Sequence, residues 1–291
     1  MADGPDFEAL IEEAGRLQQI GEMESAMECL RQAEAAASGP AELSLAIRRQ
    51  AVLFFTRSEW DRALETVRLA GQVASESGLQ DLYAEACNVE GVILQGRGNF
   101  PGATAVFEQI LGMTSDAKIR GQVLQNLGAI AAQQGNWELA RRRFQQSAKS
   151  FQRAGYVRGE AMTLNNFGRA AVEFGNVALA ADLLEQARGA ARRVGDMELL
   201  AMATMNYAEA ITGQDRLGEA EELVRSALSY FEDSGNAWRR VECLRLCGDI
   251  ALKRGDRDGA LETYRKALEI AKGIGAEAEA GILAERVASV G

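Results

Sequence analysis

Three asparagines, Asn126, Asn166 and Asn206, recur at intervals of 40 residues. An Asn side chain carries two N–H donors and one carbonyl acceptor, the groups that a peptide bond also presents. Asparagines repeated in register on successive elements would therefore bind the main chain of an extended peptide without recognising its side chains. The alternative is that Asn merely tolerates an exposed helix face, although Asn is only a mediocre helix former.

The available residue types exclude several kinds of catalysis. The chain contains no His, so it has no Ser-His-Asp triad, Cys-His pair or His-ligated zinc site. The phosphate-binding pattern G-x-x-x-x-G-K-[ST] does not occur. Because the sequence shows no recognisable nucleophile–base pair, we predict that the protein is not an enzyme and uses no cofactor and no metal.

Cys243 and Cys247 stand four residues apart on one predicted helix. Two thiolates supply half of a zinc site, and no further Cys or His is near in sequence. Small buried apolar side chains are the favoured interpretation. The four cysteines of the 291-residue chain also make no disulfide framework, which favours a reducing compartment.

Charge and composition narrow the partners and the location. The chain carries 32 basic and 42 acidic residues, a net charge of −10, whereas nucleic acid demands a basic surface. Its first residues are acidic, unlike a signal peptide, and no apolar run is long enough to span a membrane. We therefore expect a cytoplasmic protein, of bacterial origin by its Ala, Gly and Arg content, without nucleic-acid or membrane partners.

Residues 138–193 depart from this acidic average with ten basic and five acidic side chains. This Arg-rich segment would suit an acidic partner. A solvated outer face explains it equally well and is the favoured interpretation, because charge runs usually do no more than that.

A single pattern positions all of these residues: a small turn residue, four variable positions and then Ala. Seven copies place this Ala at Ala26, Ala63, Ala103, Ala140, Ala180, Ala220 and Ala260. Twelve residues earlier stands another small residue, at Ala14, Ala51, Gly91, Gly128, Gly168, Ala208 and Gly248. Four residues after the Ala stands a large apolar one, at Leu30, Val67, Phe107, Phe144, Leu184, Val224 and Tyr264.

Each copy predicts two helices. In the fifth copy the apolar spacing predicts one helix over Gly159–Phe174 and a second over Val177–Val194. Gly175 and Gly195 stand where a left-handed cap ends each helix. Small residues such as Gly168 are expected where the two helices cross, because only they permit close approach.

The pattern resembles the tetratricopeptide repeat, a family of helix hairpins. The family's motif stands here as Leu124, Leu127, Gly128, Gly135, Ala140 and Phe144. The period is mostly 40 residues rather than about 34, and the family's Pro near the repeat end is missing. In its long repeat period, the chain is similar to kinesin light chains, Pins-type scaffolds and Rap-type peptide receptors. The resemblance implies an all-α, right-handed superhelical solenoid of seven hairpins with a C-terminal capping helix.

This resemblance divides the chain into a tail, seven repeats and a cap. The tail is 1–5, and the repeats are about 6–40, 41–77, 78–114, 115–154, 155–194, 195–234 and 235–275. The cap is 276–291, in which Ile282, Leu283 and Val287 are expected to cover the last repeat.

The resemblance also implies that the first helices of the repeats line a concave, peptide-binding groove. The residues expected there are Asn126, Asn166, Asn206, Asn88, Gln122, Gln125, Asn165 and Arg169. Arg169 would meet a ligand carboxylate, or else pair with Glu173 one turn later, which is the simpler role.

The function implied is that of a non-catalytic scaffold or adaptor that binds a peptide or helical segment of a partner protein. The alternative is a regulatory receptor that senses a short peptide or small molecule and acts on a separate effector protein. Formation of homo-oligomers through the terminal helices stays open.

Overall fold

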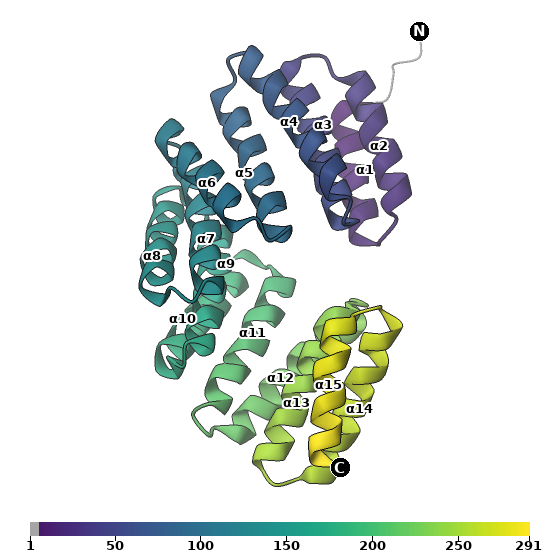
Figure 1. Ribbon diagram of the computed structural model, residues 1–291, viewed down its shortest axis with the longest axis vertical. Helices are drawn as coiled ribbons and strands as arrows, with labels where there is room; N and C mark the ends of the chain where they lie inside the picture. Colours follow the sequence, from purple (N-terminus) through teal and green to yellow (C-terminus); the bar gives the residue numbers. More distant parts are fainter. Residues whose placement is uncertain (1–5) are drawn as a thin grey trace. The chain divides into compact units, whose positions relative to one another are not determined.

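The computed structural model describes residues 6–291, so the tail predicted for residues 1–5 lies outside it. All regular secondary structure in the described residues is α-helical, as predicted. Consecutive helices pair into seven hairpins, and one helix follows them (Figure 1). The hairpins are α1 (Phe7–Gln19) with α2 (Met23–Ala36), α3 (Pro40–Thr56) with α4 (Trp60–Glu76), α5 (Gln80–Gly96) with α6 (Phe100–Met113), α7 (Ala117–Gln133) with α8 (Trp137–Arg153), α9 (Val157–Glu173) with α10 (Val177–Val194), α11 (Met197–Thr212) with α12 (Leu217–Asp233), and α13 (Ala237–Lys253) with α14 (Arg257–Gly273). The last helix is α15 (Glu277–Val290).

The turn inside each hairpin depends on one residue in the left-handed backbone region. The first residue of the repeated pattern has a positive φ in every hairpin, at Gly21 (85°), Ser58 (59°), Gly98 (81°), Gly135 (75°), Gly175 (75°), Asp215 (59°) and Gly255 (84°). Glycine enters this region without steric cost, which explains five of the seven choices. Ser58 and Asp215 occupy the same place with a Cβ and therefore carry strain.

Glycine also stands where the two helices of a hairpin touch. A Cβ added at Gly168 would lie 2.4 Å from Cγ of Leu184, and one added at Gly248 would lie 2.4 Å from Cε1 of Tyr264. Distances this short mean that the partner side chain already fills the space. The predicted reason for the repeated small residue, close approach of two helices, is confirmed.

The described chain falls into two compact units, residues 6–150 and 151–291. In the first unit the most deeply buried side chains include Leu53, Phe107 and Ile110. In the second unit they include Leu184 and Tyr264. Each unit stacks hairpins against one another, so its core runs along the stack and its first helices become neighbours.

Helix α15 packs against the rest of the second unit, largely as predicted. Leu283 is fully buried there, and Val287 packs against the same apolar cluster. Ile282 is instead 47% exposed, so its predicted covering role is wrong. The buried side chains Ala280, Leu283 and Val290 follow helical spacing, and Ile282 falls outside that row.

Candidate functional site

The candidate site lies on what we call the first-helix face, formed by the first helix of each hairpin. In the second unit α11 contacts both α9 and α13, and in the first unit α5 contacts both α3 and α7. Side chains at one register position on these helices therefore come close together across successive hairpins.

Four of the predicted asparagines are joined in two pairs by the same geometry. In the second unit, Asn206 Nδ2 on α11 donates to Asn165 Oδ1 on α9 at 2.8 Å. In the first unit, Asn126 Nδ2 on α7 donates to Asn88 Oδ1 on α5 at 3.2 Å. In each pair the donor stands two residues before its buried small residue, and the acceptor stands three before its own. These amides thus bridge neighbouring hairpins.

The two pairs differ in burial. Asn165 and Asn206 are only 7% and 5% exposed, whereas Asn88 and Asn126 are half-buried. One hydrogen bond leaves part of each amide's donor and acceptor capacity unused. The asparagines therefore hold the helices in register and present remaining polar atoms at the surface of the face.

The other predicted residues lie on the same faces. Asn166 on α9 is half-buried, as are Gln122 and Gln125 on α7. Arg169 Nε lies 3.9 Å from Glu173 Oε1, and both side chains are more than half exposed. The i,i+4 pair considered from the sequence is present but long, so it is weak and leaves the guanidinium accessible.

A polar hollow of about 180 Å³ opens between α9, α11 and α13. Its lining residues are Arg169, Val172, Glu173, Met205, Asn206, Glu209, Glu242, Arg245 and Leu246. It lies beside the Asn165–Asn206 bond, so a bound peptide group would meet amide, carboxylate and guanidinium groups together.

Glu209 is the acid at the centre of this hollow. Burial raises the pKa of its carboxyl, and the neighbouring carboxylates of Asp249, Glu242 and Glu173 raise the pKa further, while Arg245 lowers it. A hydrogen-bond donor or a cation supplied by a ligand would stabilise the ionised form of a carboxyl in this environment.

The charges around Glu209 are engaged with one another. Glu242 Oε2 accepts from Arg239 Nη1 at 2.7 Å. Arg245 Nε lies 3.0 Å from Glu279 Oε1. The contact with Glu279 is an ion pair without a hydrogen bond between these two atoms, and it keeps Arg245 beside an acid of the chain itself. Arg169 and Glu209 remain the groups best placed to meet a ligand.

Sequence reasoning did not single out Glu209. The signal was present, because Glu209 directly follows the buried Ala208, and Glu198 is the other charged residue of α11. The pairing of asparagines was missed as well, since it joins positions that differ by one residue in their repeats.

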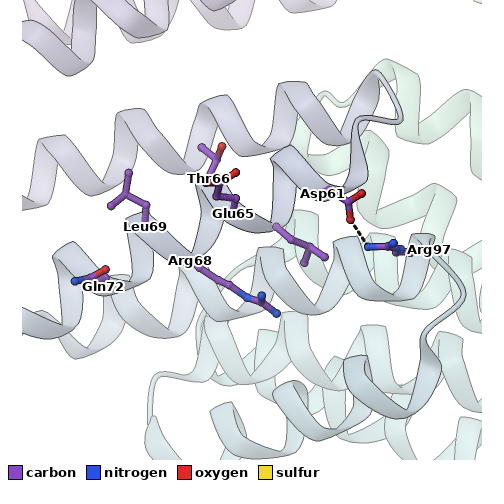
Figure 2. A pocket seen from close by; sticks show the side chains of 8 residues that line it. Asp61, Glu65, Thr66, Arg68, Leu69, Gln72 and Arg97 are labelled. Carbon is purple, nitrogen blue, oxygen red and sulfur yellow. Dashed lines mark hydrogen bonds and ion pairs between the residues drawn. The ribbon is translucent and has the colours of Figure 1, made fainter.

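A wide hollow of about 830 Å³ lies along α4, a second helix (Figure 2). Both of its arginines are already paired. Arg97 Nη1 donates to Asp61 Oδ1 at 2.6 Å, as Figure 2 shows, and Arg68 Nε donates to Glu90 Oε1, outside the lining, at 2.8 Å. The hollow is lined almost entirely by one helix, and this makes it a poorer candidate than the first-helix face.

Five of the ten basic side chains of the Arg-rich segment are ion-paired with an acidic side chain. Arg141 bonds Glu138 at 2.9 Å, and Arg158 bonds Asp196 at 2.6 Å. Arg188 pairs with Glu185 as well. A solvated outer face stays the favoured prediction for this segment.

The cysteines are placed as apolar side chains rather than ligands. Burial raises the pKa of Cys243 to about 12 and that of Cys247 to about 11, so both stay protonated thiols. No group of three or more potential metal-ligating side chains occurs among residues 6–291. In the same residues, no helix has the length and apolar character needed to cross a membrane.

Comparison with known proteins gives a family and a set of shared folds. A sequence model of the tetratricopeptide repeat matches residues 120–193 and 199–273. No curated protein is significantly similar in sequence.

Many solved structures share the fold at low sequence identity. The signal transduction ATPase with a tetratricopeptide repeat sensor from Pyrococcus horikoshii has a TM-score of 0.66 at 14% identity over 95% of this chain, which spans 44% of that protein. The apo quorum sensor NprR from B. thuringiensis has a TM-score of 0.71 at 13% identity, covering 91% of this chain and 82% of that one. A Rap protein complexed with Competence and Sporulation Factor has a TM-score of 0.63 at 16% identity, covering 91% and 77%.

Proposed function

This chain belongs to the tetratricopeptide repeat family, and on that basis we propose that it is a non-catalytic adaptor that binds a peptide or helical segment of a partner protein on its first-helix face. The observation that carries the proposal is the polar hollow between α9, α11 and α13, where Asn206, Glu209 and Arg169 converge. A peptide presents both donors and acceptors, and this hollow offers partners for both.

Asn166 is the residue that we assign to ligand rather than to the fold. It is half-buried on α9, next to Asn165, and takes part in neither asparagine pair. Its amide therefore binds a peptide N–H or C=O, while Asn126, Asn88 and Asn165 position the face. In the first unit, Gln122 and Gln125 are half-buried carboxamides on α7 to which we assign the same role.

The proposal is tested with peptides selected from a random library on the full-length chain. Replacing Asn166 with Ala should lower the affinity for the selected peptides about three- to tenfold, which is the contribution of one hydrogen bond. The matched control is Gln186→Ala, which removes a carboxamide from the exposed side of α10, a second helix. Equal affinities for both variants, or no selectable peptide at all, would contradict the proposal.

A second candidate is a peptide-sensing regulatory receptor that acts on a separate effector. Two structural neighbours favour it, because one is a quorum sensor and the other is a Rap protein bound to Competence and Sporulation Factor. A sensor should change conformation on binding, so small-angle scattering with and without a selected peptide separates the two candidates. An unchanged scattering profile supports the adaptor.

A further inference from the structure

The first unit carries a second groove, separate from the asparagine pairs, and binding of a partner there rests on the role proposed above for the first-helix face while using none of the residues assigned so far. It has a volume of about 530 Å³ and lies on the first-helix face between α1, α3 and α5. The lining residues are Phe7, Glu8, Ile11, Glu12, Ala41, Glu42, Leu45, Arg48, Leu82 and Glu85. This volume lies within the range of roughly 300–1,000 Å³ found for ligand sites.

Apolar and acidic side chains form parallel rows in this groove. On α1, Phe7 and Ile11 make one row, and Glu8 and Glu12 make the next. Residues four apart on a helix lie one above the other, so both rows run along the axis of α1. The same apolar–acidic step occurs on α3 at Ala41 and Glu42.

The acids of the groove outnumber its bases by four Glu to one Arg. The single base, Arg48, is already ion-paired with Glu85 across the floor. The neighbouring Arg49 does not line the groove, since its Nη1 reaches toward Gly15, 4.0 Å from where a Cβ would stand there.

Three carboxylates therefore lack a cation from this groove. Glu8 and Glu12 are exposed and make no ion pair within the described residues. Glu42 Oε2 accepts from the backbone N of Ser38 at 2.7 Å and from its hydroxyl at 2.8 Å, and these bonds lower the pKa of Glu42. Glu42 thus stays ionised, and the rim is negative.

We infer that this groove docks a basic amphipathic helix of a partner protein. We consider a helix with Leu-type side chains on one face and Lys or Arg along its edges. These side chains recur along the helix at the same spacing as the rows on α1. Its apolar side chains would cover Phe7, Ile11 and Leu45, and its cations would meet Glu8, Glu12 and Glu42. Charge complementarity of this kind sets the choice of partner and the rate of association.

The test uses a labelled synthetic helix with Leu along one face and Lys on the other, titrated against the full-length chain by fluorescence anisotropy. The double variant Glu8→Lys/Glu12→Lys should weaken binding at least about tenfold, since it replaces attraction with like-charge repulsion. Both side chains are exposed, so the fold is not at risk. The control Glu222→Lys/Glu232→Lys makes the same change in net charge on exposed sites of α12 and should alter affinity less than about twofold.

Two further peptides separate the groove from general attraction to an acidic protein. A peptide of the same composition with its Leu residues scrambled, and one with Glu in place of Lys, should both bind at least about tenfold more weakly. Equal binding of the scrambled peptide, equal binding of the Glu peptide, or equal effects of the two double variants would each overturn the inference. The Asn166→Ala variant should bind the synthetic helix normally, so this test fails or succeeds apart from the proposed function.

Discussion

Asn206 Nδ2 donates to Asn165 Oδ1 at 2.8 Å, and this bond joins the first helices of two successive hairpins. Both side chains are nearly buried. The bond therefore does two things at once: it gives a partner to one donor and one acceptor of two nearly buried amides, and it sets the register of α9 against α11 next to the polar hollow.

Removing this bond should destabilise the protein. Asn206→Ala leaves the buried Asn165 carbonyl without its donor, which costs about 1–3 kcal/mol of the free energy of unfolding. Asn166→Ala, one residue along α9, should cost less than about 0.5 kcal/mol. Chemical denaturation of Asn206→Ala, Asn165→Ala and the double variant measures the coupling. Strictly additive losses would show that the two amides do not interact.

The close contact at Gly168 predicts a loss of stability from a single methyl group. Because an added Cβ would lie 2.4 Å from Leu184 Cγ, Gly168→Ala should lower the free energy of unfolding by about 1–3 kcal/mol. Gly189, inside α10, has nothing within 4 Å of its Cβ position, so Gly189→Ala should raise stability by about 0.5–1 kcal/mol. The thermal midpoints of the two variants should therefore move in opposite directions, and a shift of both in one direction would refute the packing argument.

The strained turn at Ser58 predicts a gain of stability. Its φ of 59° lies where five of the other six turns use Gly, so Ser58→Gly should add roughly 0.5–1 kcal/mol. Ser77→Gly makes the same chemical change at a φ of −92° and should lower stability instead. Denaturant midpoints compare the pair, and a loss at Ser58 would show that its hydroxyl matters more than its backbone.

These turns show how much of the fold can be predicted from the sequence alone. Helices, turns and hairpin crossings follow from local rules, since each depends on residues such as Gly175 or Gly168 within one repeat. The repeated pattern therefore predicts the all-α fold and the second helix of the fifth hairpin to the residue. Ile282 was misassigned because the rotation of α15 depends on how the last hairpin packs.

The candidate site was less accessible to sequence reasoning. Asn126, Asn166 and Asn206 share one register position, and that position does lie on the first-helix face. Their partners Asn88 and Asn165 stand one register position away, so the bonds depend on the offset between neighbouring helices. Burial of Glu209 likewise results from three helices meeting, and no spacing within one repeat encodes it.

The raised pKa of Glu209 predicts a pH dependence of stability. The folded-state pKa lies above the 4.5 of an exposed Glu, so the carboxyl favours folding when protonated. That contribution is complete below the unfolded pKa and is lost as pH rises through the folded pKa.

Glu209→Gln should consequently be more stable than the parent at pH 8, by about 1 kcal/mol, with little difference at low pH. The matched control Glu222→Gln changes an exposed acid of α12 and should leave stability unaltered. Denaturation of the parent, Glu209→Gln and Glu222→Gln at low pH and at pH 8 measures the effect. A parent that is the more stable protein at pH 8 would contradict the burial of an ionised Glu209.

If ligands bind the first-helix face, hydrogen–deuterium exchange with a library-selected peptide should locate the bound peptide on the first helices. We expect slower exchange in α9 and α11, over residues 157–173 and 197–212, with no change in α10 and α12, over 177–194 and 217–233. Protection confined to the second helices, or protection that persists unchanged in Asn166→Ala at equal peptide concentration, would contradict it.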